Sequence, residues 1–290
     1  MSDKPTARLF SLSDLVTALT ADTRDAAAAL KAGRPRGPQT GLRALDKELG
    51  DYLAPGLHIL QGSPGSGKTA LSLQISSDCQ FPALFVTAEM SRLELFRRLV
   101  SRQTGTFLGR LKTGELGEAE AERLALVTAK NLSKLSILDA TVGQALPETI
   151  VASAETARGD SAHLLIVIDS LQAWARSQAP HLPEYDALGE GLRKASNLAA
   201  ELSAPVIVVS HRNRAGNTAK NGDGLHAAKG NGAIEYSAES ILDLTRDDEK
   251  PDVRGEVGVT AKLAKNRNGV SGISISLRFC GRVQSFESGN

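Results

Sequence analysis

The chain has 290 residues, of which 41% are hydrophobic, which is enough to bury the core of one large domain with accessory segments. Its net charge of +1 neither favours nor excludes a polyanionic partner, so only local clusters of charge can indicate one. The cysteines, Cys79 and Cys280, are isolated, which excludes a zinc ribbon or a dithiol redox site and favours a reducing compartment. The first residues do not have the form of a signal peptide, and the longest apolar runs are too short to cross a bilayer. We therefore expect a soluble, cytoplasmic protein with no membrane contact.

Residues 9–30 have the pattern of an amphipathic helix. Apolar side chains recur there at helical spacing, at Leu12, Leu15, Val16 and Leu19. Ser11 and Asp14 have the spacing of a capping box, and the Gly-, Pro- and Arg-rich stretch after the helix indicates a linker. We expect a helical arm, residues 1–37, before a main domain, residues 38–290. The apolar stripe of this arm needs a partner, which is either its own core or a neighbouring subunit.

In the main domain, short apolar runs alternate with helical patterns. We predict strands at residues 57–61, 83–87, 135–138, 164–169 and 206–210. We predict helices at residues 68–77, 91–104, 117–130, 147–158 and 185–202. This alternation is typical of a parallel sheet that is covered on both faces, and later strands at residues 241–244, 257–263 and 273–279 are expected to be antiparallel. The predicted fold class is therefore α/β, a mainly parallel twisted sheet flanked by helices, with antiparallel C-terminal strands.

Residues 62–69 fit the phosphate-binding pattern GxxxxGK[ST]. They are Gly62, Ser63, Pro64, Gly65, Ser66, Gly67, Lys68 and Thr69. The glycines let the backbone curl so that its N–H groups point at phosphate oxygens, while Lys68 reaches the β- and γ-phosphates and Thr69 offers a hydroxyl to Mg²⁺. A predicted strand before the motif and a predicted helix after it favour this interpretation over a glycine-rich turn with a stray lysine. We therefore predict a P-loop ATPase with ATP and Mg²⁺ as cofactors.

Two carboxylates follow predicted strands of this sheet. Asp169 ends an apolar strand, at the place where P-loop ATPases hold Mg²⁺. Glu89 leaves the carboxyl end of another strand, so it can face the γ-phosphate and orient or deprotonate the attacking water. The alternative for Asp169 is that it merely ends an ordinary buried strand. The alternative for Glu89 is that it merely precedes a helix. With the P-loop present, we predict Asp169 and Thr69 as the metal-binding pair and Glu89 as a catalytic residue.

Further stretches resemble the motor domain of DnaB-type replicative helicases, in the RecA-like hexameric helicase family. They are Thr40-Gly41 with Leu45-Asp46, Ala88-Glu89-Met90-Ser91, Gly232-Ala233-Ile234-Glu235 and Ala264-Lys265-Asn266-Arg267-Asn268-Gly269. The resemblance implies a RecA-like fold, with Glu89 as the catalytic base. It also implies a homo-oligomeric ring, a hexamer, that works as a helicase or translocase on single-stranded DNA in DNA replication.

The resemblance assigns Lys265 and Arg267 to the γ-phosphate that the adjacent subunit binds, where an arginine finger raises the rate by several orders of magnitude. We expect the late strands that carry them at the far side of the sheet order from the P-loop. The alternative is a solvated basic turn between two strands. His211 occupies the sensor position after the fourth strand of the family, where DnaB types usually carry Gln and either side chain can bond a γ-phosphate oxygen. The alternative for His211 is a local contact at a strand end.

Residues 211–233 align with the central-channel loop of the family. Candidate DNA-binding residues there are Arg212, Arg214, Lys220, Lys229, Gly230 and Gly232. Basic side chains and glycine amides suit phosphate contacts without reading bases. Where the family's loop ends in an Arg-Glu pair, this chain has Lys229-Gly230, and aromatic stacking platforms are missing from the segment. The alternative is a disordered basic loop with no DNA contact.

Residues 1–37 are similar to the family's linker helix, which packs on the neighbouring subunit, so we expect a motor without a collar domain. A RadA-like recombination or branch-migration ATPase is one alternative, because that family also carries a Lys-Asn-Arg motif, although Asn268 here replaces its aromatic residue. A KaiC-like regulatory ATPase that binds no DNA is another. Stimulation of ATP hydrolysis by single-stranded DNA is expected of the helicase and of the RadA-like ATPase, but not of the KaiC-like ATPase. Strand displacement on a forked duplex distinguishes the helicase from the RadA-like ATPase.

Overall fold

The computed structural model describes residues 9–211, 238–247, 251–253 and 255–289. The chain divides into two compact units, Met1–Arg36 and Gly37–Asn290. The first unit contains helix α1 (Leu12–Lys31), which the sequence predicted, and its capping box is present, with Ser11 N–H donating to Asp14 Oδ2 at 2.8 Å. Its apolar stripe is exposed, with Leu12 at 85% and Leu19 at 68% of full exposure. No helix in the described part of the chain has the length and apolarity to cross a membrane.

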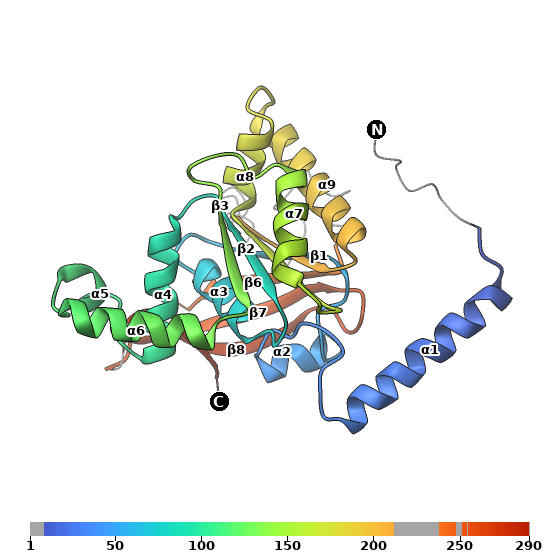
Figure 1. Cartoon of the computed structure of the whole chain (residues 1–290), viewed down its shortest axis with the longest axis horizontal. Coiled ribbons are helices and arrows are strands. Elements are labelled where there is room, and N and C mark those ends of the chain that lie inside the picture. Colours follow the sequence, from blue (N-terminus) through green and yellow to red (C-terminus); the bar gives the residue numbers. More distant parts are fainter. Residues whose placement is uncertain (1–8, 212–237, 248–250, 254, 290) are drawn as a thin grey trace. The chain divides into compact units, whose positions relative to one another are not determined.

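The second unit is built on one nine-stranded sheet with the order β3-β2-β4-β5-β1-β6-β7-β8-β9 (Figure 1). Its strands are β1 (Gly56–Gly62), β2 (Ala83–Thr87), β3 (Leu135–Asp139), β4 (Leu165–Asp169), β5 (Pro205–His211), β6 (Ser240–Arg246), β7 (Glu256–Asn266), β8 (Ile273–Cys280) and β9 (Ser285–Ser288). All pairings from β3 to β6 are parallel, and those from β6 to β9 are antiparallel. The predicted α/β fold class is therefore confirmed.

Helices cover both faces of the parallel part. They are α2 (Arg43–Glu48), α3 (Lys68–Asp78), α4 (Arg92–Thr104), α5 (Arg110–Thr113), α6 (Glu118–Asn131), α7 (Pro147–Arg158), α8 (Leu171–Gln178) and α9 (Glu184–Leu202). Helices α2, α5 and α8 were not predicted, because four to eight residues are too few to establish a helical period, and strand β9 was not predicted because it contains one apolar residue, Phe286.

The apolar residues of each inner strand alternate between two cores. In β4, Leu165 and Val167 join the core under α2, α3 and α4, whereas Ile166 and Ile168 join the core under α7, α8 and α9. Every residue of β4 is buried, as expected for a parallel strand with helices on both sides. Strand β7 instead alternates for most of its length between buried and more exposed residues, so the antiparallel extension is covered mainly on one face.

Strand direction divides the sheet into two chemically different edges. Because β2, β4, β5 and β1 are parallel neighbours, their carboxyl ends meet at one edge, which we call the carboxyl edge. Strand β7 runs the other way, so its last residue, Asn266, pairs with Ser240, which in turn pairs with His58 near the start of β1. Residues that follow β7 therefore lie at the opposite edge, which we call the amino edge.

Candidate active site

The phosphate-binding loop joins the carboxyl end of β1 to the first turn of α3. Strand β1 ends at Gly62, and α3 begins at Lys68 with Gly67 as its N-terminal cap. Gly67 has a φ of 91°, and a Cβ there would lie 2.6 Å from the ring of Phe286 on β9. Only glycine fits both the backbone angle and the close aromatic neighbour. The fold itself thus requires the last glycine of the motif.

Two side chains of this motif, Ser66 and Lys68, are buried where an anionic ligand would bind. Lys68 is 5% exposed, and its Nζ donates to the carbonyl oxygens of Gly62 at 2.8 Å and Ser63 at 2.9 Å. Burial lowers the pKa of Lys68, and the nearby carboxylates oppose that change. Ser66 Oγ is buried and has no hydrogen-bond partner among the described residues. A phosphate at the start of α3 would supply acceptors for both groups.

Asp169 lies beside this loop at the end of β4. It is 5% exposed, and the hydroxyl of Thr69 lies close enough to lower the pKa of its carboxylate. Burial raises the pKa of Asp169 from its ordinary value of 3.8 to about 6, although the hydroxyl of Thr69 and the charge of Lys68 favour the ionised form. A hydroxyl and a carboxylate this close are hard oxygen ligands of the kind that Mg²⁺ prefers, so the predicted metal-binding pair fits that ion.

Glu89 and His211 meet at the same edge. Thr87 pairs with Asp169, so Glu89 leaves β2 next to the end of β4. The Oε1 atom of Glu89 accepts a hydrogen bond from Ser170 Oγ and lies 3.2 Å from His211 Nε2. The bond from His211 lowers the pKa of Glu89, burial opposes this change, and Ser170 adds to the lowering. Glu89 is 44% exposed, so it stays ionised and open to water at neutral pH.

Gln172 is a residue of this site that the sequence analysis missed. Strand β5 continues two residues beyond its pairing with β4, to Ser210 and His211. Beyond the end of β4, the side-chain amide of Gln172 bonds these two residues. Its Nε2 donates to Ser210 Oγ at 3.0 Å and to the backbone oxygen of His211 at 3.4 Å, and its Oε1 accepts from His211 N–H at 3.3 Å. The only sequence signal was its position three residues after Asp169.

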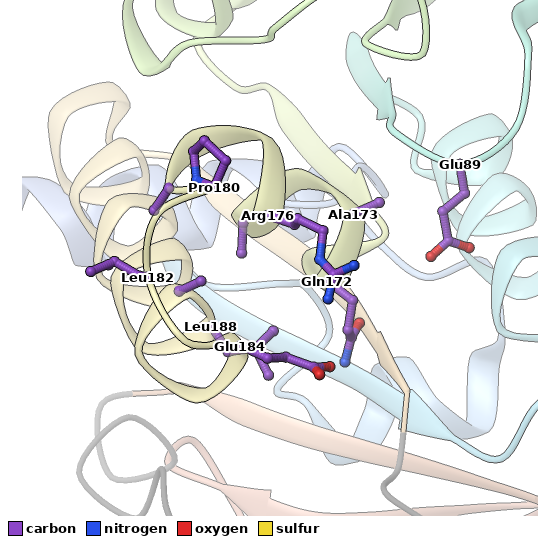
Figure 2. Close-up of a pocket in the computed structure, with 11 residues that line it drawn as sticks. Glu89, Gln172, Ala173, Arg176, Pro180, Leu182, Glu184 and Leu188 are labelled. Atoms are coloured by element: carbon purple, nitrogen blue, oxygen red, sulfur yellow. The ribbon is translucent and has the colours of Figure 1, made fainter.

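A pocket of about 620 Å³ borders Glu89 (Figure 2). Glu89 faces the side chains of α8 and the start of α9 across it, including Gln172, Arg176 and Glu184. Lys68 and Thr69 do not line this pocket, so we do not assign the nucleotide to it.

Arg267 lies at the amino edge, away from the P-loop of its own chain, whereas Lys265 lies two residues earlier on β7, level with Ile59 in the middle of β1. Arg267 N–H donates to the backbone oxygen of Glu239 at 2.9 Å, and Glu239 N–H donates to Leu57 O, at the start of β1. From Gly56 to Gly62, β1 spans about 20 Å at about 3.3 Å per residue. The separation was expected from the strand order, but β7 is only two strands from β1. The separation of Arg267 from the P-loop results instead from the direction of β7, which runs opposite to β1.

The turn that carries these two residues has a defined construction. A β-bulge in β7 leaves Ala264 outside the register, just before Lys265, and bulges of this kind redirect the side chains that follow them. Asn266 is 7% exposed; its Nδ2 donates to Glu48 O at the end of α2, and its Oδ1 accepts from Asn268 N–H. The Asn266 side chain therefore anchors the turn, and the role of the two basic side chains beside it stays a prediction.

The candidate DNA-binding residues Arg212, Arg214, Lys220, Lys229, Gly230 and Gly232 lie outside the described residues. Of the other site residues, the structure brings Lys68, Thr69, Glu89, Asp169 and His211 together at the carboxyl edge. Lys265 and Arg267 are separate from them.

These features define the class: a P-loop fold whose phosphate-binding motif lies beside two carboxylates and a histidine at the carboxyl edge of the sheet. The family model "DnaB-like helicase C terminal domain" matches residues 37–288, and the chain belongs to this family. The replicative DNA helicase DnaB of Treponema pallidum is 29% identical over 249 residues, which cover 84% of this chain and 54% of that protein. The chain thus spans about half the length of the curated relatives it matches.

Solved structures show the same fold. A DnaB-like replicative helicase, whose structure was solved together with its interactions with primase, has a TM-score of 0.77 at 20% identity, covering 98% of this chain and 68% of that one. The RadB recombinase has a TM-score of 0.57 at 22% identity, covering 87% of this chain and 99% of that one. Both likenesses support the RecA-like architecture that the sequence predicted.

Proposed function

We propose that this chain is an ATP-hydrolysing DNA translocase and helicase motor of the DnaB type. The observation that carries the proposal is the meeting of Lys68, Thr69, Asp169 and Glu89 at one edge of the sheet, in a chain that belongs to the DnaB-like family. A lysine, a hydroxyl–carboxylate pair and an exposed second carboxylate are the groups that ATP hydrolysis needs.

Each group has one proposed role. Lys68 neutralises charge on the β- and γ-phosphates, and Thr69 with Asp169 holds Mg²⁺. When bound there, Mg²⁺ would supply positive charge that offsets the negative charge of the phosphate oxygens. Glu89 accepts a proton from the attacking water, which its ionised state at neutral pH permits. His211 orients Glu89 through the contact at 3.2 Å and forms a hydrogen bond with a γ-phosphate oxygen.

In this proposal the site of one chain is incomplete, because Arg267 lies at the other edge of the sheet and Lys265 lies two residues before it on β7. We propose that the two residues complete the site of a neighbouring copy, which requires a homo-oligomer, a hexameric ring in this proposal. Helix α1, with its exposed apolar stripe, docks on a neighbouring subunit and stabilises this ring.

The backbone of single-stranded DNA is bound, in this proposal, by basic and glycine residues of one segment: Arg212, Arg214, Lys220, Lys229, Gly230 and Gly232. The protein acts in the cytoplasm.

The deciding experiment measures ATP hydrolysis with and without single-stranded DNA, together with the mass of the assembly in solution. We expect Mg²⁺-dependent hydrolysis that single-stranded DNA stimulates, in an oligomer. Strand displacement on a forked duplex then tests the helicase activity itself. Stimulation without displacement favours a RadA-like branch-migration ATPase, and hydrolysis that ignores DNA favours a KaiC-like regulatory ATPase. No hydrolysis under any condition refutes the proposal.

A further inference from the structure

We propose that Glu239 is a positioning residue for Arg267, which it holds in the orientation that reaches the neighbouring active site. This inference rests on the proposed function, because it deepens the role of Arg267 in trans.

The first observation is a direct ion pair. Arg267 Nη1 donates to Glu239 Oε1 at 3.1 Å, where the Arg267 side chain is 48% exposed and the Glu239 side chain is 20% exposed. A guanidinium presents its N–H donors in a fixed planar fork. A carboxylate that engages one nitrogen therefore restricts the plane and direction of the whole group.

The second observation is that Glu239 is itself firmly held. Its backbone N–H donates to Leu57 O at 2.7 Å, and its backbone oxygen accepts from Arg267 N–H at 2.9 Å. Its side chain lies over Gly56, where an added Cβ would be 2.5 Å from Glu239 Cγ. Gly56 also has a φ of 140°, so both the backbone angle and the close Glu239 side chain favour glycine at this position. The carboxylate is thus attached to the start of β1 by both its backbone and its packing.

The third observation is the geometry of the turn. The Arg267 backbone is fixed on one side by Asn266, which bonds the end of α2, and on the other by its own bond to Glu239. These contacts fix the backbone, but they leave the long side chain with several rotatable bonds. The Glu239 carboxylate restricts these bonds as well. Since a displacement of about 1 Å in a catalytic group can cost about a hundredfold in rate, such restriction has a measurable consequence.

A mixing experiment assigns the effect to one side of the subunit boundary. Lys68→Ala supplies a donor chain with an intact Arg267 but no working P-loop, and Arg267→Ala supplies an acceptor chain with the reverse. Each is expected to be inactive alone, and their mixture to regain ATP hydrolysis. If this pair does not complement in assemblies shown by mass to contain both chains, the trans role fails, and the positioning role of Glu239 fails with it.

Given complementation, Glu239→Ala is placed first in the donor and then in the acceptor. We expect the donor double variant to restore at least about tenfold less activity than the donor alone. We expect the acceptor double variant to complement normally, because its own Arg267 is already missing. Glu239→Gln in the donor should keep most of the activity, since its amide oxygen still accepts the bond from Arg267.

Glu256 provides a matched control within the same sheet. Its side chain is 21% exposed and bonds Arg278, which is 46% exposed, at 2.7 Å. Glu256→Ala in the donor removes an ion pair of the same kind without touching Arg267, and it should leave complementation intact. Three results would overturn the inference. Glu256→Ala could reduce the complemented ATP hydrolysis as much as Glu239→Ala does, Glu239→Ala could reduce it equally from the acceptor chain, or Glu239→Ala in the donor chain could leave it unchanged. Thermal unfolding of every chain alone confirms that it is folded.

Discussion

Replacing Asp169 by asparagine should make the ligand-free protein more stable at neutral pH, although it removes a metal ligand of the proposed site. Burial raises the pKa of Asp169 from 3.8 to about 6. A group whose pKa is raised by folding favours the folded state when it is protonated, and this advantage is lost as the pH rises through the folded pKa. At pH 8 the ionised carboxylate therefore lowers the free energy of unfolding.

The magnitude follows from the pKa. A rise of about 2 units corresponds to about 3 kcal/mol when the carboxylate is fully ionised, at pH 8, and to about half of that at pH 5. The asparagine side chain has no such dependence, and its oxygen is still an acceptor for the hydroxyl of Thr69. For a domain of this size, about 3 kcal/mol corresponds to a rise in Tm of roughly 6–12 °C. We expect the Tm difference between Asp169→Asn and the wild type to be about twice as large at pH 8 as at pH 5.

The assay is thermal unfolding by circular dichroism, in buffer that contains a chelator and no nucleotide. Asp139, at the end of β3, is the control of opposite sign. Burial alone would raise the pKa of Asp139, but the hydrogen bonds from Thr141 and Arg92 outweigh it and lower that pKa. Asp139→Asn should therefore destabilise the protein at pH 8, and less so as the pH falls toward 3. A Tm difference for Asp169→Asn that is negative or independent of pH would refute the reasoning.

The remaining predictions concern the proposed machinery. Lys68→Ala should abolish ATP hydrolysis and weaken nucleotide binding, and unchanged turnover would remove the basis of the proposed function. Glu89→Gln should bind ATP yet hydrolyse it at least about a hundredfold more slowly, the usual effect of a lost general base; single-turnover kinetics with a binding measurement test this. Gln172→Ala should slow hydrolysis about tenfold with little change in ATP affinity, because three bonds that hold the end of β5 disappear, and it should add nothing to His211→Ala if it acts through that residue. Removal of residues 1–37 should weaken oligomer formation while ATP binding by the remaining chain persists, and an unchanged mass at low micromolar concentration would contradict the docking role of α1.

Local patterns predicted much of the architecture. Buried parallel strands such as β2 and β4 are continuous apolar runs, and the motif of residues 62–69 needs its strand and helix on either side, so both were readable from one sequence. The order of the strands was not readable, because it depends on which apolar faces pack together across the sheet. The short helices were missed for want of periodic residues, and β9 because it contains one apolar residue.

Contacts between distant residues were the other limit. Gln172 belongs to the site through an amide that completes the end of β5, 39 residues away. Glu239 contacts Arg267 across 28 residues, and neither residue type nor spacing indicates that pair. A sequence motif marks residues that act from one segment, whereas the groups that orient them come from wherever the fold places a suitable donor or acceptor.

The reversal of strand direction between β6 and β7 has a consequence for how the protein can work. Strands β1 to β6 run parallel and gather Lys68, Glu89 and Asp169 at the carboxyl edge. Strand β7 returns along β6, and so Arg267 emerges at the start of β1, about 20 Å from the loop that would hold the phosphates. No rotation of one side chain spans that distance. In the proposed mechanism, a site is therefore complete only when the amino edge of one copy faces the carboxyl edge of another. Such a head-to-tail contact closes into a ring or continues as a filament, and the solution mass distinguishes the two.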